Sequence, residues 1–484
     1  MTYDARTRHE PATRSPAPEL RRRLPSLMAD ALIPGLSIAV IEDGSLTWDG
    51  AFGVKHAQTG EPVQATTVFE SASTGKAVFA YAVLKLVDRG ELDLDTPLVE
   101  YTPLRYLTEG WIRPLLQDDR IADITARMAL THSTGFPNWP SDGGEFAFAP
   151  GTRWGYSGMA FVYLGATVVR VTGLRLDEFV RREALLPCGM THSWFKWRDR
   201  FAITGASQHT VLARAQPMHR FVEPLAAGSL YTTAADFGSF LVAVLNSDGL
   251  GGMTTREMLR PQMPVDGAPN ITWGLGIGLH DTPQGETIWH WGNNIDAKAY
   301  FEVRREDGRG FVYFANSRNG LAMVDEVGQL CLGQPTCAVS KGPSEFGRYD
   351  AVDSPVMEMC RAYRSAGPER ALRLYREADG AGASLPPEVV APLARDILAL
   401  GDLGGGLRLG DEVARAHPDN ARAHILHGEA HLMTGNQEAA YVCLSRARDL
   451  DASMVADLSE VCSRLVELGR SQEARALREW TRWH

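Results

Sequence analysis

Ser73 and Lys76 form an S-x-x-K tetrad at the start of a predicted helix. Residues three positions apart lie on one face of a helix, so this spacing places the lysine amine beside the serine hydroxyl. A serine hydroxyl becomes an effective nucleophile when a neighbouring base removes its proton. A lysine can be that base if burial or a nearby positive charge lowers the pKa of its amine. The tetrad therefore indicates acyl transfer to Ser73, although a serine here could also serve only as a helix N-cap.

The segments around the tetrad predict a mixed fold. Residues 35–54 hold two apolar runs separated by an Asp-Gly turn, the pattern of a β-hairpin. Residues 77–89 are apolar at helical spacing and end at Gly90, which is typical of a helix C-terminus. Further strands are predicted at residues 287–291, 299–303 and 311–315. Strands at both ends with helices between them indicate an α+β fold, in which helices flank an antiparallel sheet.

A different pattern occupies the C-terminal part of the chain, where Ala, Leu, Arg and Glu replace the strand signals. Four glycines follow one another at intervals of 34 residues: Gly367, Gly401, Gly435 and Gly469. A helix–turn–helix unit of this length resembles the tetratricopeptide repeat, although a plain helical bundle with spaced glycines would look similar. The glycine run at residues 404–406 predicts an irregular second helix in its repeat.

Length and composition set the domain organisation. A chain of 484 residues exceeds the size at which one hydrophobic core stops growing. We predict a disordered N-terminal arm at residues 1–26, a domain containing Ser73 at 27–345, and helical repeats at 346–484. The net charge of −10 argues against a nucleic-acid partner. The sequence has no long apolar run, so we expect no membrane span and a cytoplasmic location.

Seven segments resemble, in order, the motifs of the class C β-lactamases and their penicillin-binding, esterase and D-peptidase relatives. They are FESASTGK at 69–76, LVDRGELDLDTP at 86–97, LTHSTGFP at 130–137, PGTRWGYSG at 150–158, AGSLYTTAAD at 227–236, WGLG at 273–276 and WHWG at 289–292. The resemblance covers residues 27 to about 340. It implies a β-lactamase/transpeptidase-like fold and a serine hydrolase that needs neither metal nor cofactor.

The resemblance also implies roles for individual residues. Ser73 would carry the acyl group, and Lys76 would help remove its proton. Tyr156 would act with Lys76 as general base and then as acid, with a phenolate favoured by the adjacent ammonium. The backbone amides of Ser73 and Asn293 would form the oxyanion hole. His290 would line the wall and orient the substrate, and Gly292 would leave room for the substrate backbone.

Two positions depart from the family pattern. Gly158 stands where the second motif usually has an asparagine, whose amide contacts the acyl side chain of β-lactams and peptides. His290 stands where many members have a lysine, so a positive charge for a substrate carboxylate is absent. Both changes favour esters or unusual amides over penicillin-like substrates.

Other histidines have simpler interpretations. His132 lies in a Thr-His-Ser-Thr-Gly loop and is predicted to satisfy backbone groups. His424, His427 and His431 have the i, i+3, i+7 spacing of a helix face. They could bind a metal, but without a carboxylate or cysteine on that face we predict helix packing and no metal site.

The sequence thus predicts hydrolysis of an ester or amide through an acyl-Ser73 intermediate, on a small-molecule or short-peptide substrate. Acyl transfer to an alcohol or amine is the first alternative. The second is an inactive scaffold or sensor that binds peptides through its repeats, because stacked helices form a concave surface for a protein or peptide partner.

Overall fold

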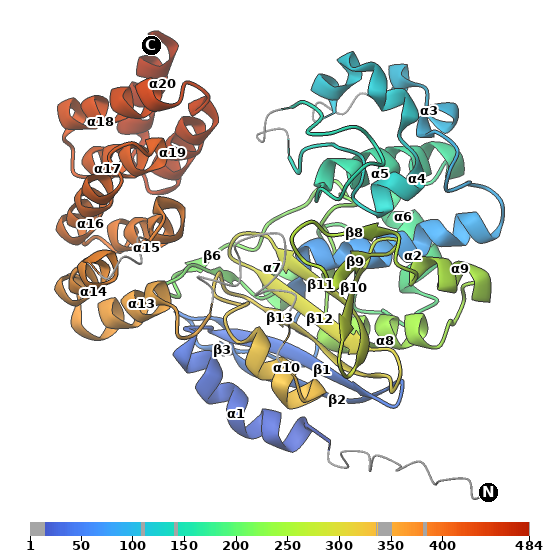
Figure 1. The fold of residues 1–484 in the computed structure, drawn as a ribbon. Coiled ribbons are helices and arrows are strands. Elements are labelled where there is room, and N and C mark those ends of the chain that lie inside the picture. The colour runs from blue at the N-terminus through green and yellow to red at the C-terminus, as the bar shows by residue number, and fades with distance from the viewer. Residues whose placement is uncertain are drawn as a thin grey trace, which may run out of the picture.

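The computed structural model describes residues 15–107, 112–139, 144–334, 336, 351–380 and 385–483. At its centre lies a nine-stranded antiparallel sheet with the strand order β3-β2-β1-β13-β12-β11-β10-β9-β8 (Figure 1). Its strands are β1 (Gly35–Glu42), β2 (Ser45–His56), β3 (Glu61–Pro62), β8 (Met263–Pro264), β9 (Ile271–Trp273), β10 (Gly278–Thr282), β11 (Gly285–Asn293), β12 (Lys298–Arg304) and β13 (Arg309–Ala315). The early strand β1 pairs directly with β13, the last in the sheet. The predicted α+β fold is confirmed.

The β1–β2 hairpin has the turn that its sequence predicts. Asp43 and Gly44 have φ values of 51° and 67°, as a two-residue type I′ turn requires. The side chains of β1 alternate between two apolar cores, because successive residues of a strand point to opposite faces. Ala39 and Ile41 belong to one core, and Leu36, Ile38 and Val40 belong to the other.

Helices cover both faces of the sheet. On one face lie α1 (Ala17–Asp30) and α10 (Val324–Leu332), which share a core with β1 and β13. On the other face lie α8 (Ala234–Leu245) and α2 (Gly75–Asp88). A helical region adjoins α2 and contains α3 (Leu98–Tyr101), α4 (Ala126–Leu130), α5 (Gly158–Thr172) and α6 (Leu176–Val180) (Figure 1). The remaining short elements of this domain include α7 (Phe201–Thr204), α9 (Gly252–Met258), and the strand pairs β4 (Phe69–Glu70) with β7 (Tyr231–Thr232) and β5 (Gln208–His209) with β6 (Ala215–Gln216).

The predicted disordered arm is wrong for its second half. Residues 1–14 lie outside the described residues, but α1 begins at Ala17, well before residue 26. The helix buries four apolar side chains at helical spacing: Leu20, Leu24, Leu27 and Met28. Their packing against the sheet stabilises the helix. The prolines and arginines of this segment had suggested a chain without such a face.

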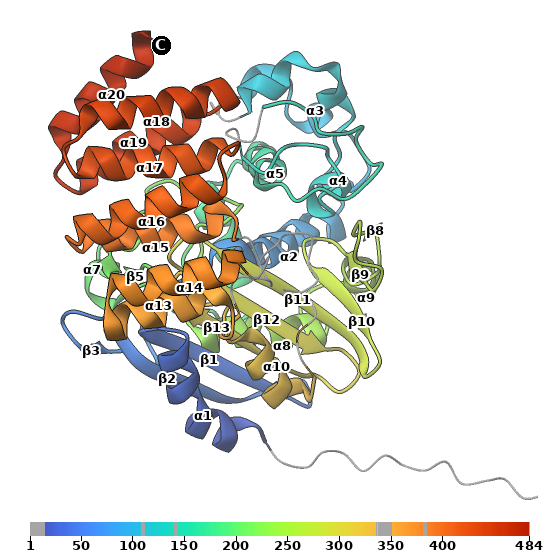
Figure 2. The same ribbon diagram turned by 60° about the vertical axis from the view of Figure 1, so that its left-hand side comes forward.

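The described residues after 350 form helices that pair as hairpins, as Figure 2 shows. They are α13 (Pro355–Ala366) with α14 (Pro368–Gly380), α15 (Pro387–Ala399) with α16 (Leu403–Ala416), α17 (Ala421–Met433) with α18 (Gln437–Leu450), and α19 (Val455–Glu467) with α20 (Ser471–Trp483). The four glycines of the 34-residue period lie at the turns of these hairpins, with φ between 76° and 89°. This all-helical region fits the predicted repeats. The predicted boundary at residue 345 lies outside the described residues.

The irregular helix predicted at residues 404–406 is wrong, because α16 runs through this glycine run. Asp402 is its N-cap and accepts a hydrogen bond from the Gly405 N–H. A Cβ on Gly406 would lie 2.4 Å from Leu398 Cγ of α15. The glycine therefore allows the two helices of this hairpin to approach closely.

The β5–β6 hairpin joins the sheet domain to the helical repeats. Its tip residues Val211 and Leu212 belong to the apolar core formed by α13, α14 and α15. Asp396 of α15 is buried and accepts hydrogen bonds from the Leu212 N–H (2.9 Å) and from Arg214 Nε (3.3 Å). The two parts of the chain thus share a buried interface.

In the described part of the chain, no single helix is long and apolar enough to cross a membrane. The bent pair Gly158–Thr172 and Leu176–Leu185 would do so only jointly, judged by length and composition alone.

Candidate active site

Ser73 lies in a strand-to-helix turn that the sheet holds in place. The short strand β4 pairs with β7, and the Ser71 N–H donates to Leu230 O at 2.9 Å. A single 3₁₀ turn (Ala72–Thr74) follows and leads directly into α2. Ala72 has a φ of 48°, an uncommon conformation for a residue with a side chain. The turn thereby places Ser73 at the N-terminal end of the helix, as the tetrad predicts.

Lys76 contacts the Ser73 hydroxyl from the first turn of α2. Its Nζ lies 3.0 Å from Ser73 Oγ and 2.5 Å from Ala227 O. The side chain is fully buried, with its amine over the rings of Tyr156 and Phe161. Burial disfavours the charged form and lowers the pKa of Lys76 to about 7. A large fraction of this lysine is therefore uncharged at neutral pH and able to accept the serine proton.

Tyr156 adjoins Ser73 in the same cavity, but its ionisation differs from the prediction. Burial raises the pKa of its hydroxyl, and the nearby Ser73 only partly offsets that effect. No hydrogen bond of ordinary geometry joins the two hydroxyls among the described residues. Because the pKa of the neighbouring lysine is itself lowered to about 7, its ammonium form is depleted near neutral pH and favours a phenolate less. The environment instead keeps Tyr156 as a neutral phenol, which can donate a proton.

His132 packs beneath the tyrosine. Its Nδ1 accepts a hydrogen bond from the Ser157 N–H at 3.0 Å, and its ring lies 4.3 Å from that of Tyr156. It is fully buried, which holds its pKa well below the ordinary value. As predicted, this histidine satisfies a backbone group, and it also supports the Tyr156 ring.

The sequence predicted that His290 lines the wall of the site, but its neighbour Trp291 lines the cavity instead. His290 is fully buried, and its Nδ1 lies 2.6 Å from Trp291 O. Burial, with a contribution from Lys76, lowers the pKa of His290 to about 3. The imidazole is therefore neutral and cannot supply the positive charge that a lysine would supply there.

Gly292 and Asn293 bring β11 close to the Ser73 turn. A Cβ on Gly292 would lie 2.4 Å from Ser71 O and 3.1 Å from Ala72 Cβ. The glycine is therefore needed for the approach of the chain's own backbone, whereas the sequence had suggested room for substrate. Asn293 lines the cavity, and its Oδ1 accepts hydrogen bonds from Lys298 Nζ (2.6 Å) and the Ile295 N–H (3.0 Å).

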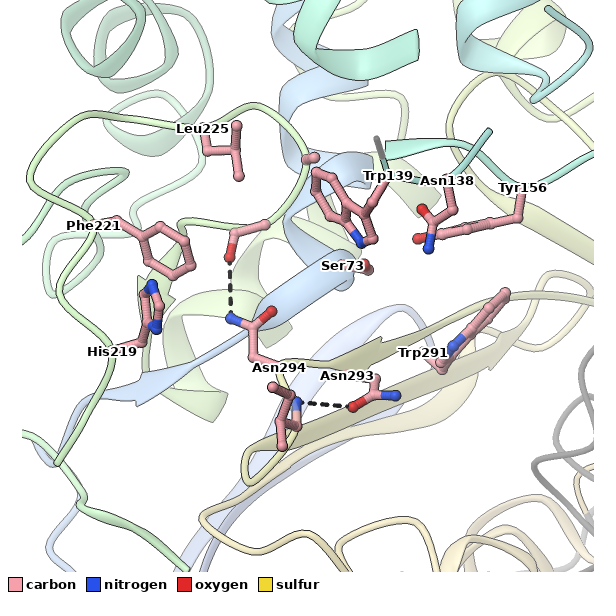
Figure 3. A pocket seen from close by; sticks show the side chains of 13 residues that line it. Ser73, Asn138, Trp139, Tyr156, His219, Phe221, Leu225, Trp291, Asn293 and Asn294 are labelled. Carbon is pink, nitrogen blue, oxygen red and sulfur yellow. Dashed lines mark hydrogen bonds between the residues drawn. The ribbon is translucent and has the colours of Figure 1, made fainter. Parts of the chain in front are cut away.

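Gly158 begins α5 beneath Trp139, and a Cβ there would lie 2.8 Å from that indole ring. Its N–H donates to Asn138 Oδ1 at 2.9 Å. Asn138 lines the cavity beside Ser73 and Tyr156, as Figure 3 shows. The amide that is absent at Gly158 is thus present nearby, contributed by another segment. Asn138 directly follows the LTHSTGFP segment and lies outside the seven motifs, so the sequence did not indicate this role.

The cavity has a volume of about 690 Å³ and a mostly apolar lining. The sequence did not predict its larger side chains, which come from strand β11 (Trp291) and from separate loops: Trp139, His219, Phe221, Leu225, Asn294 and Ile295. Ser73, Tyr156 and Asn293 reach this cavity, whereas Lys76 lies buried behind Ser73. Among the described residues that line it there is no lysine, arginine, aspartate or glutamate.

Glu70 connects the Ser73 turn to the cavity wall. Its Oε1 accepts hydrogen bonds from Gln208 Nε2 (2.6 Å) and the His219 N–H (2.7 Å), and its Oε2 accepts one from Asn294 Nδ2 (2.9 Å). Burial raises the pKa of this carboxyl to about 7. Glu70 lies three residues before Ser73, but its partners are distant in the chain, so local spacing does not indicate this role.

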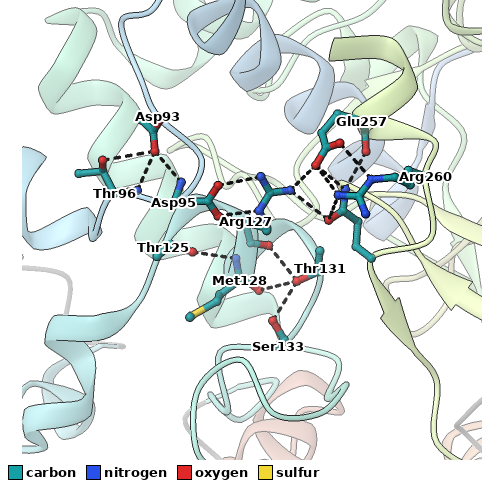
Figure 4. Close-up of polar contacts among 11 residues, drawn as sticks. Asp93, Asp95, Thr96, Thr125, Arg127, Met128, Thr131, Ser133, Glu257 and Arg260 are labelled. Atoms are coloured by element: carbon teal, nitrogen blue, oxygen red, sulfur yellow. Dashed lines mark hydrogen bonds and ion pairs between the residues drawn. The ribbon is translucent and has the colours of Figure 1, made fainter. Parts of the chain in front are cut away.

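A polar network around Arg127 holds the segment that carries His132 (Figure 4). The Arg127 guanidinium of α4 donates to Asp95 (2.6 and 2.8 Å) and to Glu257 (2.6 Å). Hydrogen bonds from Arg260, Gln262 and Arg127 together lower the pKa of Glu257 to about 2. One turn later, Thr131 Oγ1 lies 2.9 Å from Ser133 Oγ. The loop that supports Tyr156 is thereby joined to two neighbouring elements.

Comparison with known proteins agrees with this geometry. The family model described as Beta-lactamase matches residues 20–330. Esterase EstB of Burkholderia gladioli is 26% identical over 343 residues, which cover 57% of this chain and 86% of that protein. Penicillin-binding protein 4 of Amycolatopsis lactamdurans is 30% identical over 183 residues, 36% of this chain and 48% of that protein.

Two solved structures show the same fold at low sequence identity. D-alanine carboxypeptidase AmpC from Burkholderia cenocepacia has a TM-score of 0.53 and 22% identity, and the match covers 62% of this chain and 95% of that one. The octameric penicillin-binding protein homologue from Pyrococcus abyssi has a TM-score of 0.56 and 20% identity, with coverage of 72% and 82%.

Proposed function

Because the chain belongs to the beta-lactamase family of serine hydrolases, we propose that it hydrolyses a neutral ester through an acyl intermediate on Ser73. The observation that carries the proposal is the 3.0 Å contact between Lys76 Nζ and Ser73 Oγ in a fully buried position. A lysine there can exist as the free amine, which is the form that a general base requires.

In the proposed acylation, Lys76 takes the Ser73 proton while Ser73 Oγ bonds to the substrate carbonyl carbon. The carbonyl oxygen becomes an oxyanion, and the backbone N–H groups of Ser73 and Asn293 would stabilise it. Tyr156 donates its proton to the leaving alcohol as the ester C–O bond breaks, and it regains a proton from the Lys76 ammonium. In deacylation these steps run in reverse, with water in place of the alcohol. Water attacks the acyl carbon and gives its proton to Tyr156, while Lys76 returns a proton to Ser73 Oγ, so that the acid and free Ser73 are released.

The cavity lining favours an ester substrate that carries no carboxylate. Its described lining offers no lysine or arginine to pair with a substrate anion, and the buried His290 is neutral. Its aromatic and aliphatic walls suit an apolar acyl or alcohol group. The similarity to an esterase over 86% of that protein's length supports the same substrate class.

The test is the mass of the intact protein during reaction with a short-chain nitrophenyl ester. We expect an acyl adduct on Ser73 and its loss on hydrolysis, and we expect Ser73→Ala to lose turnover by on the order of 10⁴ or more. Ser71→Ala, two residues earlier in the same turn, is the matched control and should keep the adduct. Turnover in Ser73→Ala within about tenfold of the parent would overturn the proposal.

The same experiment separates the alternatives. Added alcohol or amine that diverts the acyl group from water would indicate acyl transfer. A protein that forms no adduct with either an ester or a fluorophosphonate would instead be a binding protein. A peptide or protein partner on the helical repeats remains a separate proposal, which a peptide-binding screen on the full chain would test.

A further inference from the structure

Two histidines and a cysteine meet on the helical repeats, far along the chain from Ser73. His427 and His431 lie one turn apart on α17, and Cys443 lies on the partner helix α18. One side-chain ligand atom from each of the three lies within 4.8 Å of the others. His427 Nδ1 and Cys443 Sγ are 3.6 Å apart, and the two imidazole rings are 4.6 Å apart.

This arrangement changes the interpretation drawn from the sequence. The histidine spacing alone favoured packing because no cysteine or carboxylate was evident on that helix face. The hairpin turn at Gly435 brings Cys443 to that face. His424, by contrast, contacts a backbone group outside the cluster, because its Nε2 lies 2.8 Å from Pro418 O.

The three groups have the chemistry of a zinc site. Imidazole nitrogen and thiolate sulfur are the ligands that Zn²⁺ prefers, at about 2.0–2.1 and 2.3 Å. In a tetrahedral site, such bonds place neighbouring ligand atoms about 3.3–3.8 Å apart. The 3.6 Å separation of His427 Nδ1 and Cys443 Sγ already lies in this range. Two histidines at i and i+4 on one helix face are a known way to bind this ion.

Two further observations favour a ligand over packing. The Nδ1 of His431 is buried and has no hydrogen-bond partner among the described residues, so packing leaves a polar atom unsatisfied. The Asp411 carboxylate of the adjacent α16 acts electrostatically on all three groups and can favour a cation among them.

We propose that His427, His431 and Cys443 bind one Zn²⁺ ion that ties α17 to α18. Zinc replaces the thiol proton, and Cys443 binds as the thiolate. Three protein ligands leave a fourth position for water or for the Asp411 carboxylate, which is ion-paired with Arg415 in this structure. The ion would fix one hairpin of the repeats and would take no part in chemistry at Ser73.

The test uses the full-length chain, freed of metal by a chelator, reduced, and titrated with Co²⁺. We expect thiolate-to-cobalt charge-transfer absorption and tetrahedral d–d bands that saturate at one equivalent and disappear when Zn²⁺ is added. Cys443→Ser should remove the charge-transfer band. His431→Ala should weaken binding at least as much as the roughly 10-fold to 100-fold loss that follows removal of an outer-shell partner.

Two matched variants control for the other histidines and thiols of the chain. His424→Ala on the same helix and Cys462→Ser on α19 should bind Co²⁺ as the parent does. Zinc should raise the unfolding temperature of the parent and of both controls, but not that of Cys443→Ser. The side chains of His431 and Cys443 are partly exposed, and far-ultraviolet circular dichroism will show whether each variant keeps its helices.

The proposal is overturned if no band saturates at one equivalent in the parent. It is equally overturned if whichever of Cys443→Ser and His431→Ala is folded, as judged by dichroism, binds Co²⁺ as tightly as the parent. These two substitutions lie on different helices, so an unfolded variant of one leaves the other as the test.

Discussion

Lys76 is the residue whose environment most affects the proposed chemistry. Its amine is held by two uncharged oxygens, Ser73 Oγ and Ala227 O, in a fully buried position. Desolvation lowers its pKa from 10.5 to about 7. The base form is the unprotonated amine, so its population grows as the pH rises through about 7 and falls below it.

We therefore predict that kcat/KM for a nitrophenyl ester rises with pH to a plateau above a midpoint near 7. Lys76→Arg should lose activity by on the order of 10²–10⁴, because a guanidinium stays protonated. His219 also lines the cavity, so the pH profile of His219→Gln is the control and should keep the midpoint. A profile that falls through this range would contradict the assignment of Lys76 as base.

Asn138 gives a sharper test of substrate class than Gly158 does. Gly158→Asn would press against Trp139, since even a Cβ there lies 2.8 Å from the indole. Asn138→Asp keeps an oxygen to accept the Gly158 N–H but removes the amide donor. We predict that it lowers kcat/KM for a chromogenic cephalosporin relative to a nitrophenyl ester by about tenfold to a hundredfold, equivalent to about 1–3 kcal/mol.

Asn138→Ala is the companion variant, and it should also lower stability because the Gly158 N–H loses its partner. If the ratio of the two substrates is the same in the parent and in Asn138→Asp, the amide does not contact the acyl side chain.

At this scale, the sequence could predict what local spacing determines. Ser73 and Lys76 lie three residues apart on one helix, and Tyr156 lies within a recognisable motif. Asn138 and Glu70 escaped notice because their partners are distant in the chain. The ionisation of Tyr156 was mispredicted because it depends on the depth of burial, which no local pattern reveals.

Among the elements, α16 shows how neighbouring glycines can serve opposite purposes. Gly404 is exposed, and a Cβ there would meet only Arg408 Nη1 at 3.8 Å. Gly406 is buried, with Leu398 Cγ at 2.4 Å from such a Cβ. We predict that Gly404→Ala stabilises the repeats by about 0.8–1 kcal/mol through helix propensity. Gly406→Ala should destabilise them by about 1–3 kcal/mol through overpacking.

Urea unfolding of the full chain, followed by far-ultraviolet dichroism, measures both changes. A similar loss of stability in the two variants would mean that the helices are not packed as described.

The elements that were predicted correctly have a local signal. The β1–β2 hairpin has its Asp-Gly turn, and the repeat hairpins have their spaced glycines. The helix α1 was missed because its stability comes from packing of Leu20, Leu24 and Leu27 against a sheet that the local sequence does not show. The regularity of α16 was missed for the same reason, since the cap at Asp402 and the close partner α15 outweigh the low propensity of glycine.

For the whole molecule, the β5–β6 hairpin determines how independent the two parts are. Deletion of residues 346–484 would uncover Val211 and Leu212, which are now buried against the repeats. We predict that the truncated protein still acquires an acyl group on Ser73 from a small activated ester, because every described residue lining the cavity lies before residue 300. Its unfolding temperature should be lower, and it should aggregate more readily than the full chain.

Val211→Ser with Leu212→Ser in the truncated protein is the matched variant, and it should reduce the aggregation. A well-folded truncated protein without any acylation would show that the repeats contribute to the active site, through Gln208 and Glu70 or otherwise.

The pairing of β1 with β13 also governs the order in which the protein can fold during synthesis. β1 can form its hairpin with β2 early, but its other edge stays open until residues 309–315 have been made. Until then, this edge of an apolar strand offers unpaired backbone groups that can pair with the wrong strand. The nascent chain is therefore prone to aggregation throughout this interval. The repeats, whose contacts are local, can fold quickly once they emerge. We therefore expect the serine to remain inert until most of the chain has left the ribosome.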